Sequence, residues 1–456
     1  MEAAQAVDLG FDDGFELPVI DLHKYYRAVT SLSTYRIKGK VTELTGLVVK
    51  AVVPGVRVGE LCYIQTFNAR ALPIKAEVVG FKDKEVLLMP LGDLEGIGPG
   101  NDVIPTGGCL KVRVGDGLLG RVLDGLGDPI DAETHGPLSY DTEYPVMAPP
   151  PDPLTRKRIS KPISVGIRCI DSVLTVGEGQ RVGIFAAAGV GKSTTMGMLA
   201  RNCDSDVNVI CLVGERGREL RDFLEKDLGE AGMARSVVVV STSDQPSLVR
   251  SKAAYVATAI AEYFRDQGRT VLLMMDSVTR FARALREIGL AIGEPPARQG
   301  FTPSVFSTLP KLLERTGNSA TGSITAFYTV LVEGDDMTEP VADEVRSILD
   351  GHIVLSRALA ARGHYPAVDV SESVSRVMSS IVDEEHEQAA RKLREVVANY
   401  EKERDLILIG AYEAGSDPNV DYAIEKIEDV NNFLKQHVMD KIHLSESVDE
   451  LKNIFM

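Results

Sequence analysis

The chain contains the stretch Val182-Gly183-Ile184-Phe185-Ala186-Ala187-Ala188-Gly189-Val190-Gly191-Lys192-Ser193, which is followed by a run of helical character over Thr194–Arg201. A phosphate-binding loop needs small residues whose backbone N–H groups face the phosphates, a lysine for the β/γ-phosphate charge, and a hydroxyl for Mg²⁺. The stretch supplies all of these except the usual first glycine, which is replaced by Ala186 at the position least engaged in the chemistry. Because an apolar strand precedes the loop and a helix follows it, we predict a nucleotide-binding loop rather than an ordinary glycine-rich turn.

Strand-like and helix-like runs alternate around this loop, between Arg181 and Val374. Such alternation is typical of a mainly parallel sheet flanked by helices. Short β-branched runs broken by glycines cover Arg36 to Val103, including Val56-Arg57-Val58-Gly59, and predict a small β-barrel. Beyond Ser375 only the helical spacing of apolar residues remains. We therefore predict an α/β protein with four parts: an N-terminal interaction segment (1–25), a small β-barrel (26–103), a P-loop (RecA-like) parallel-sheet ATPase domain (104–376) and a helical C-terminal domain (377–456).

The composition limits the classes of partner. The chain has 456 residues, with 50 Lys and Arg against 66 Asp and Glu, and a formal net charge of −16. This balance argues against a protein whose main task is to grip nucleic acid or an anionic membrane. Five cysteines without a Cys-x-x-Cys pair indicate neither a disulfide framework nor a zinc site, and they fit a reducing cytoplasm.

Targeting signals are also missing from the sequence pattern. Residues 1–21 carry six acidic residues and no Lys or Arg, which is unlike a secretory signal. The longest apolar runs are far shorter than the ~20 residues that a membrane crossing needs. We expect a soluble protein that reaches a membrane only through partners.

Two apolar strands after the loop end in carboxylates. Val271 to Met275 leads into Asp276, which could hold Mg²⁺, although an Asp at a strand end is also a common helix cap or turn former. Val209 to Val213 leads into Gly214-Glu215-Arg216-Gly217-Arg218-Glu219, where Glu215 could orient and polarise an attacking water. A solvated ion-pair cluster of these charged residues fits the same pattern, so both interpretations stay open at this stage.

Together these motifs resemble a known family. The loop, the Gly214–Glu219 segment and three further segments are similar to the catalytic subunits of rotary F-type ATP synthases, and more closely to the type III secretion ATPases, which include flagellar and injectisome members. The likeness runs from Gly39-Lys40-Val41 to Asp421. The alanines of the loop, together with Phe281-Ala282-Arg283-Ala284, look more like the injectisome version. The three further segments are Met275-Asp276-Ser277-Val278-Thr279-Arg280-Phe281-Ala282-Arg283, Gly293-Glu294-Pro295-Pro296 and Tyr365-Pro366-Ala367-Val368-Asp369.

The resemblance implies roles for individual residues. Lys192 would bind the β/γ-phosphates, Ser193 and Asp276 would serve Mg²⁺, and Glu215 would activate water. Tyr365 falls where the F-type chain places an aromatic ring against adenine, although a core or hinge tyrosine is the other interpretation. Arg216, Glu219 and Arg280 match positions that support the glutamate and the phosphates. The residues expected at the nucleotide are Gly189, Val190, Gly191, Lys192, Ser193, Thr194, Arg216 and Tyr365.

The resemblance also implies that one further arginine acts at the nucleotide site of the adjacent subunit in a ring. Ser373-Val374-Ser375-Arg376 matches the segment by which the non-catalytic F-type chain presents an arginine to the adjacent nucleotide, although a surface ion pair would also explain Arg376. Here Glu215 and Arg376 lie on one chain, whereas the F-type enzyme divides these duties between two chains. Identical copies could therefore build every site between themselves.

The resemblance thus implies a homo-hexameric, Mg²⁺-dependent ATPase of a type III secretion apparatus, which releases chaperones from export substrates and unfolds them. It would work in the cytoplasm, held at the inner membrane through the apparatus. The partners expected are a regulatory stalk protein at the N-terminus, a central coiled-coil stalk at the pore-facing loop Gly293–Gly300, and chaperone–substrate complexes at the helical domain. A flagellar export ATPase is the nearest alternative.

Two other classes fit the sequence less well. A hexameric RNA translocase would need a basic cluster around the barrel aromatics, but none surrounds Tyr35, Tyr63, Phe67 and Phe81. A non-catalytic scaffold subunit should have lost Lys192, Glu215 or Asp276, and all three are present.

Overall fold

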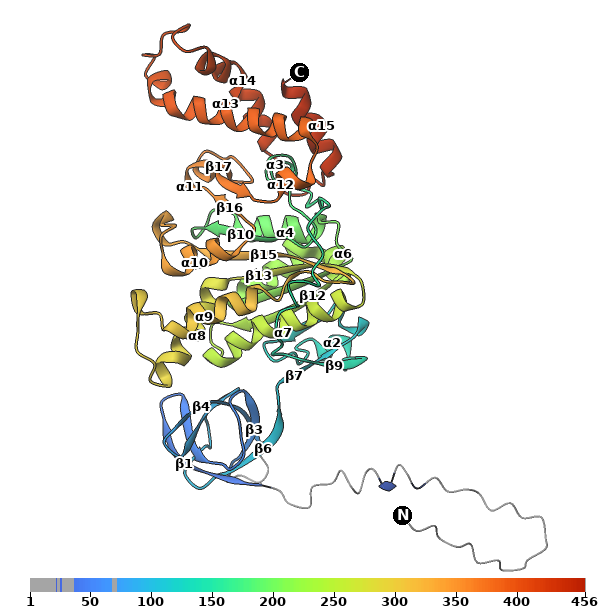
Figure 1. The fold of residues 1–456 in the computed structure, drawn as a ribbon, viewed down its shortest axis with the longest axis vertical. Helices are drawn as coiled ribbons and strands as arrows, with labels where there is room; N and C mark the ends of the chain where they lie inside the picture. Colours follow the sequence, from blue (N-terminus) through green and yellow to red (C-terminus); the bar gives the residue numbers. More distant parts are fainter. Residues whose placement is uncertain (1–21, 23–24, 27–36, 68–71, 456) are drawn as a thin grey trace, which may run out of the picture.

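The computed structural model describes residues 22, 25–26, 37–67 and 72–455. Its parts follow one another along the long axis: the barrel at one end, the nucleotide-binding domain in the middle and the C-terminal helices at the other end (Figure 1). The order of these parts agrees with the sequence-based prediction. The interaction segment expected over 1–25 lies almost wholly outside the described residues, as does Tyr35.

The N-terminal strands close into a barrel in the order β1-β2-β5-β4-β3-β6. Its inward side chains, such as Val49, Ile64 and Leu88, are fully buried. The strand expected at Val56–Gly59 is wrong, because this segment is a turn that leads into β3 and Gly59 has a φ of +84°. The last barrel strand runs beyond residue 103, so we place the end of the barrel after Cys109. The strands are β1 (Gly39–Thr45), β2 (Val48–Val52), β3 (Glu60–Gln65), β4 (Ile74–Lys82), β5 (Glu85–Pro90) and β6 (Asp102–Cys109).

The central domain is built on a sheet of the order β17-β16-β10-β15-β13-β11-β12-β8. All neighbours in it are parallel except β17, which runs antiparallel to β16. The predicted parallel sheet is therefore confirmed. The strands are β8 (Val122–Asp124), β10 (Arg181–Ala186), β11 (Val207–Glu215), β12 (Ser236–Thr242), β13 (Thr270–Asp276), β15 (Ser323–Leu331), β16 (Gly351–Leu355) and β17 (Val368–Ser375), with the short β14 (Gly317–Asn318) beside β15 and a separate pair β7 (Lys111–Val114) and β9 (Thr142–Pro145).

Helices cover both faces of this sheet (Figure 1). A strand that is covered on both faces reads as a continuous apolar run, and every residue from Val271 to Met275 is indeed fully buried. The helices of this domain are α2 (Ala132–His135), α3 (Arg168–Val173), α4 (Lys192–Asn202), α5 (Gly217–Asp222), α6 (Gly229–Ala234), α7 (Ser247–Asp266), α8 (Val278–Ala291), α9 (Pro303–Leu313), α10 (Pro340–Ile348) and α11 (Arg357–Ala361).

The C-terminal helices are α12 (Met378–Ile381), α13 (Glu384–Leu408), α14 (Pro418–Leu434) and α15 (Leu444–Phe455). Their buried side chains, such as Leu393 and Leu451, join one apolar core with those of α4 and β10. The predicted helical domain is confirmed, and it packs directly on the nucleotide-binding domain.

A buried ion pair joins the barrel to the central domain. Nζ of Lys252 on α7 lies 2.6 Å from Oε2 of Glu77 on β4, and both residues are buried. Among the helices of the described residues, none has both the length and the apolar character that a membrane crossing requires.

Candidate functional site

The phosphate loop lies between β10 and α4, at the carboxyl edge of the sheet. Gly189 and Gly191 have φ angles of +82° and +92°, a region in which a side chain is strained, so glycine is required at both. Ala186 instead is the last residue of β10, paired with Leu331 and Leu355. Since its backbone is in the extended conformation of a strand, the missing first glycine leaves the loop geometry intact.

Two buried carboxylates lie beside this loop. Glu215 ends β11 and Asp276 ends β13, and these neighbouring strands are parallel, so both side chains reach the same edge. Nζ of Lys192 lies 3.8 Å from Oε1 of Glu215 and also contacts Oδ1 of Asp276. The hydroxyl of Thr329 on β15 donates to the same Oδ1 at 2.7 Å. The lysine of the loop and the two carboxylates thus form one charged cluster.

The protonation of Glu215 is set by its surroundings. Burial, together with a hydrogen bond to the side chain of Glu219, raises the pKa of Glu215, whereas the charges of Lys192 and Arg280 lower it. Nη2 of Arg280 lies 3.3 Å from Oε1 of Glu215, and its Nη1 donates to the carbonyl of Gly214. A carboxylate with a raised pKa beside two cations is suited to accept a proton from water.

The charged segment after β11 divides into a buried and an exposed part. Glu215 is only 7% exposed. The side chain of Arg216 is 80% exposed, and its Nη1 lies 3.6 Å from Oε1 of Glu219. The solvated ion-pair interpretation therefore fits Arg216 and Glu219 but does not fit Glu215.

Tyr365 lies close to the phosphate loop. A Cβ atom built on Gly191 would stand 3.7 Å from Cε1 of the Tyr365 ring. The ring is half-exposed, and the carbonyl of Tyr365 accepts a hydrogen bond from the backbone N–H of Gln436 at 3.0 Å. An accessible aromatic face next to the phosphate loop is suited to stack on a base.

The remaining loop residues differ in exposure. Val190 is buried and anchors the loop, Thr194 is half-buried, and Ser193 is exposed at the start of α4. The first N–H groups of this helix have no partner within the helix, and they favour an anion at that position.

A metal at this site would rely on few protein ligands. The described residues contain no group of three or more His, Cys, Asp and Glu side chains that could hold a metal ion. The oxygens present, the Ser193 hydroxyl and the Asp276 carboxylate, are ligands that suit Mg²⁺, which usually keeps several waters and completes its shell with phosphate oxygens. The residues thus fit Mg²⁺ that binds together with a nucleotide.

Arg376 lies at the opposite edge of the sheet. It follows Ser375, which pairs with Gly351 at the start of β16, whereas Ala186 of the loop pairs with Leu355 at the end of β16. The length of that strand, about 13 Å at ~3.3 Å per residue, separates the two positions. Arg376 is exposed, and its Nη2 donates to the carbonyl of Arg346 at 3.2 Å. The side chain of Arg376 therefore cannot reach the phosphate loop of its own chain.

Thr329, which donates a hydrogen bond to Asp276, was not predicted from the sequence. The only signal for it is a hydroxyl inside the otherwise largely apolar strand β15, and its partner comes from β13. Such a pair becomes visible only when the order of the strands is known.

Models of known protein families match three parts of the chain. The family model for the nucleotide-binding domain of the ATP synthase alpha/beta family matches residues 166–375, and the β-barrel model of that family matches 41–107. The model for the T3SS EscN ATPase C-terminal domain matches 382–453.

Similar proteins cover nearly all of the chain. The flagellum-specific ATP synthase of Bacillus subtilis is 54% identical and covers 92% of this chain and 96% of its own length. The type 3 secretion system ATPase of Xanthomonas euvesicatoria is also 54% identical, covering 93% and 95% respectively. Among solved structures, the assembled ATPase EscN from the type III secretion system of enteropathogenic E. coli has a TM-score of 0.86 at 47% identity, over 92% of this chain and 100% of that chain. EscN in complex with its central stalk EscO has a TM-score of 0.84 at 46% identity, with the same coverage of both chains.

Proposed function

Because this chain belongs to the ATP synthase alpha/beta family, in the group of the type III secretion and flagellar export ATPases, we propose that it hydrolyses ATP in sites that neighbouring copies share within a homo-hexameric ring. The chain is an ATP hydrolase of type III protein export. We further propose roles for single residues, for Mg²⁺ and for partner proteins.

Each group in the site has a separate task. The loop N–H groups and Lys192 bind the β/γ-phosphates, and Glu215 orients the attacking water and takes its proton. Arg280 holds the Glu215 carboxylate in place. Ser193 and Asp276 are the residues that would hold Mg²⁺, which neutralises phosphate charge when it is bound.

One observation carries the shared-site proposal: Glu215 and Arg376 lie at opposite edges of the same sheet. An arginine that neutralises charge on the transferred phosphoryl group must stand beside the γ-phosphate. Because Arg376 cannot reach its own loop, it serves the loop of the next copy.

Specific activity should therefore rise with protein concentration. A lone subunit lacks the arginine of its neighbour, so it binds ATP but hardly hydrolyses it, whereas an assembled ring has complete sites. ATPase rates and molar mass by light scattering are measured on the same dilution series, with equilibrium ATP binding as the control that should not change. Activity per subunit that stays flat from monomer to ring would contradict the shared site.

The central stalk is the proposed partner of the loop Gly293–Gly300, which connects α8 to α9. Glu294 of this loop is tied to the fold, since its carboxylate accepts hydrogen bonds from the backbone N–H and the hydroxyl of Ser304. Ala297 and Arg298 remain exposed. EscN was solved in complex with its central stalk. We propose that the exposed tip of this loop contacts a coiled-coil stalk or a passing export substrate.

A cysteine at Ala297 should crosslink to the stalk protein of the same secretion system. Cys109 is the exposed native cysteine and is first replaced by Ser, because the other four cysteines are buried. Ala132→Cys on α2 is the matched control, since Ala132 is also exposed but lies on a different element. The purified stalk should react with the first position and not with the second, as seen by mass spectrometry. Equal capture at both positions would exclude the loop as the contact.

The remaining partners follow from the family. We propose that the acidic N-terminal residues bind a regulatory stalk protein, that chaperone–substrate complexes meet the helical domain, and that the enzyme acts in the cytoplasm at the inner membrane through the apparatus. Neither nucleic acid nor a direct membrane contact is part of the proposal. The injectisome branch is preferred for its alanine-rich loop, and the flagellar enzyme remains the alternative, because both kinds of relative reach 54% identity. Genes next to that of this chain would separate the two.

A further inference from the structure

Strand β17 ends at Ser375, directly before Arg376, and it contains a β-bulge opposite Ile353 that we call the turn of β17. β17 pairs with β16 through Asp369 and Val354 and again through Val374 and His352, so the residues between Asp369 and Val374 have no partners in the ladder. Their backbone carbonyls therefore need other donors, because a buried carbonyl without a hydrogen bond is costly.

Arg394 on α13 supplies these donors. Its Nη1 donates to the carbonyls of Val370 at 2.5 Å and Ser373 at 3.0 Å, and its Nη2 donates to the carbonyl of Val173 at 3.2 Å. Val173 is the last residue of α3, where helix carbonyls lack partners within the helix. One guanidinium thus ties together the helical domain, the end of α3 and the turn in β17.

The contacts of Arg394 are unusual for a half-buried cation. No carboxylate forms an ion pair with it among the described residues, and burial lowers the pKa of its guanidinium. Three carbonyls in a fixed arrangement suit the planar fork of an arginine, which a lysine could not reproduce.

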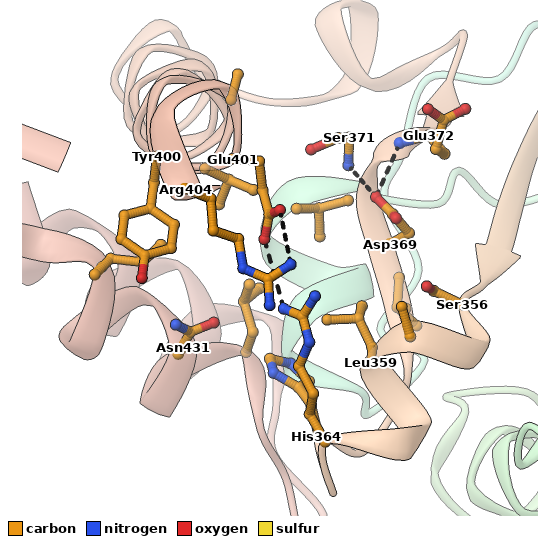
Figure 2. Close-up of a pocket in the computed structure, with 18 of the residues that line it drawn as sticks. Ser356, Leu359, His364, Asp369, Ser371, Glu372, Tyr400, Glu401, Arg404 and Asn431 are labelled. Atoms are coloured by element: carbon orange, nitrogen blue, oxygen red, sulfur yellow. Dashed lines mark hydrogen bonds and ion pairs between the residues drawn. The ribbon is translucent and has the colours of Figure 1, made fainter. Parts of the chain in front are cut away.

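Side-chain packing holds only part of this turn, because Val370 is buried in an apolar core whereas Ser371 and Glu372 are exposed. A cavity of about 490 Å³ lies on one side of it, lined by Val370 and Glu372 together with residues of α11, α13 and α14 (Figure 2). A second cavity of about 250 Å³ is lined by Val374, Ser375 and Arg394 itself. Polar contacts therefore add to this packing in fixing the position of the turn.

The turn itself is well braced. The Asp369 carboxylate accepts hydrogen bonds from the backbone N–H groups of Ser371 and Glu372, at 3.0 and 3.2 Å (Figure 2). The hydroxyl of Ser373 donates to the Asp369 carbonyl and accepts from the N–H of Val354. The brace makes the turn a rigid unit, and Arg394 attaches that unit to α13.

We propose that Arg394 is a positioning residue for the active site of the neighbouring copy: by holding the turn of β17 it sets the direction in which Arg376 leaves the sheet. This inference rests on the proposed sharing of sites through Arg376. It also couples the helical domain to hydrolysis, because a movement of α13 would shift the strand that leads into Arg376.

Mixed rings can show on which side of the interface Arg394 acts. An Arg376→Ala chain has a sound loop but no arginine to lend, and a Lys192→Ala chain has a defective loop but an intact Arg376. Their mixture should regain hydrolysis at sites where the loop of an Arg376→Ala chain meets the Arg376 of a Lys192→Ala chain. Arg394→Met, which keeps an apolar stem and removes the donors, is then added to one chain or to the other.

Placed on the Lys192→Ala chain, which lends Arg376, Arg394→Met should lower the regained activity about tenfold or more, since a displacement near 1 Å can cost ~10² in rate. Placed on the Arg376→Ala chain, it should leave that activity within about twofold, and the KM for ATP should stay the same in both mixtures. Arg391→Met is the matched control, because Arg391 lies one turn earlier, is exposed and, among the described residues, forms an ion pair with Glu387 alone. Native mass spectrometry checks that all mixtures form rings.

The outcomes separate two failures. Without any recovery in the starting mixture, the shared site itself is wrong. With recovery, an equal loss from both placements would show that Arg394 merely stabilises its own chain, and no loss from either would show that it has no part in catalysis. Both of these results would overturn the inference.

Discussion

Glu215→Gln is expected to lower kcat about 10²–10⁴-fold, the range typical of lost general-base catalysis, while ATP affinity stays within about threefold of the wild type. The amide keeps the size of the side chain and an oxygen that can face Arg280, but it cannot accept the proton of water. In the proposed mechanism Glu215 acts on the water rather than on the phosphates, so the ground-state complex should be preserved. Single-turnover hydrolysis and equilibrium nucleotide binding measure the two effects separately.

Lys192→Ala is the matched variant for this experiment. In the proposed mechanism Lys192 contacts the phosphates in the ground state, so its loss should weaken ATP binding as well as hydrolysis. Since Nζ of Lys192 lies within 4 Å of both carboxylates, the variant also removes the cation that balances Glu215 and Asp276. Hydrolysis by Glu215→Gln within threefold of the wild type would exclude Glu215 as the base.

Arg376→Ala is expected to lower kcat by as much as ~10³–10⁵-fold, the effect of an arginine that stabilises charge during phosphoryl transfer. ATP affinity and thermal stability should hardly change, because Arg376 is exposed and makes only one side-chain hydrogen bond, to the carbonyl of Arg346, among the contacts described. Steady-state kinetics at a protein concentration that saturates ring assembly measures the loss, with Arg391→Ala as the control for the removal of an exposed arginine.

The effect of Arg376→Ala must be distinguished from a defect in assembly. Rings of normal mass with little activity are the expected result. If the variant failed to form rings but regained full activity when rings were forced by high concentration, Arg376 would be an interface residue without a catalytic role. A kcat within threefold of the wild type would leave it as an ordinary surface arginine.

Part of the site could be predicted from the sequence because of one geometric rule. Parallel strands end at the same edge of a sheet, so a loop after one strand and carboxylates after two others were expected to meet, as Lys192, Glu215 and Asp276 do. Ala186 has a separate explanation. It lies inside strand β10, where the backbone does not require glycine, so alanine at this position does not indicate an inactive site.

Other features depend on contacts between distant parts of the chain. Arg394 lies on a helix whose sequence shows only an amphipathic pattern, and its three carbonyl partners come from α3 and β17. The turn at Val56–Gly59 was misread because two valines suggested a strand, although Gly55 and Gly59 adopt left-handed conformations that end one. The residue types in a sequence say little about which backbone groups a side chain will contact, or about which conformation a single glycine will adopt.

The separation of Glu215 and Arg376 across the sheet also has a genetic consequence. If neighbouring copies share sites as proposed, a copy that lacks both Lys192 and Arg376 would have an inactive loop and would also deprive its neighbour of the arginine. In a cell that carries one normal and one such mutant allele, the mutant product would enter rings with the normal product. Each mutant copy would then inactivate its own site and also the neighbouring site that depends on its arginine. The inactive allele would therefore be dominant, and its severity would grow with its expression more steeply than the fraction of mutant chains.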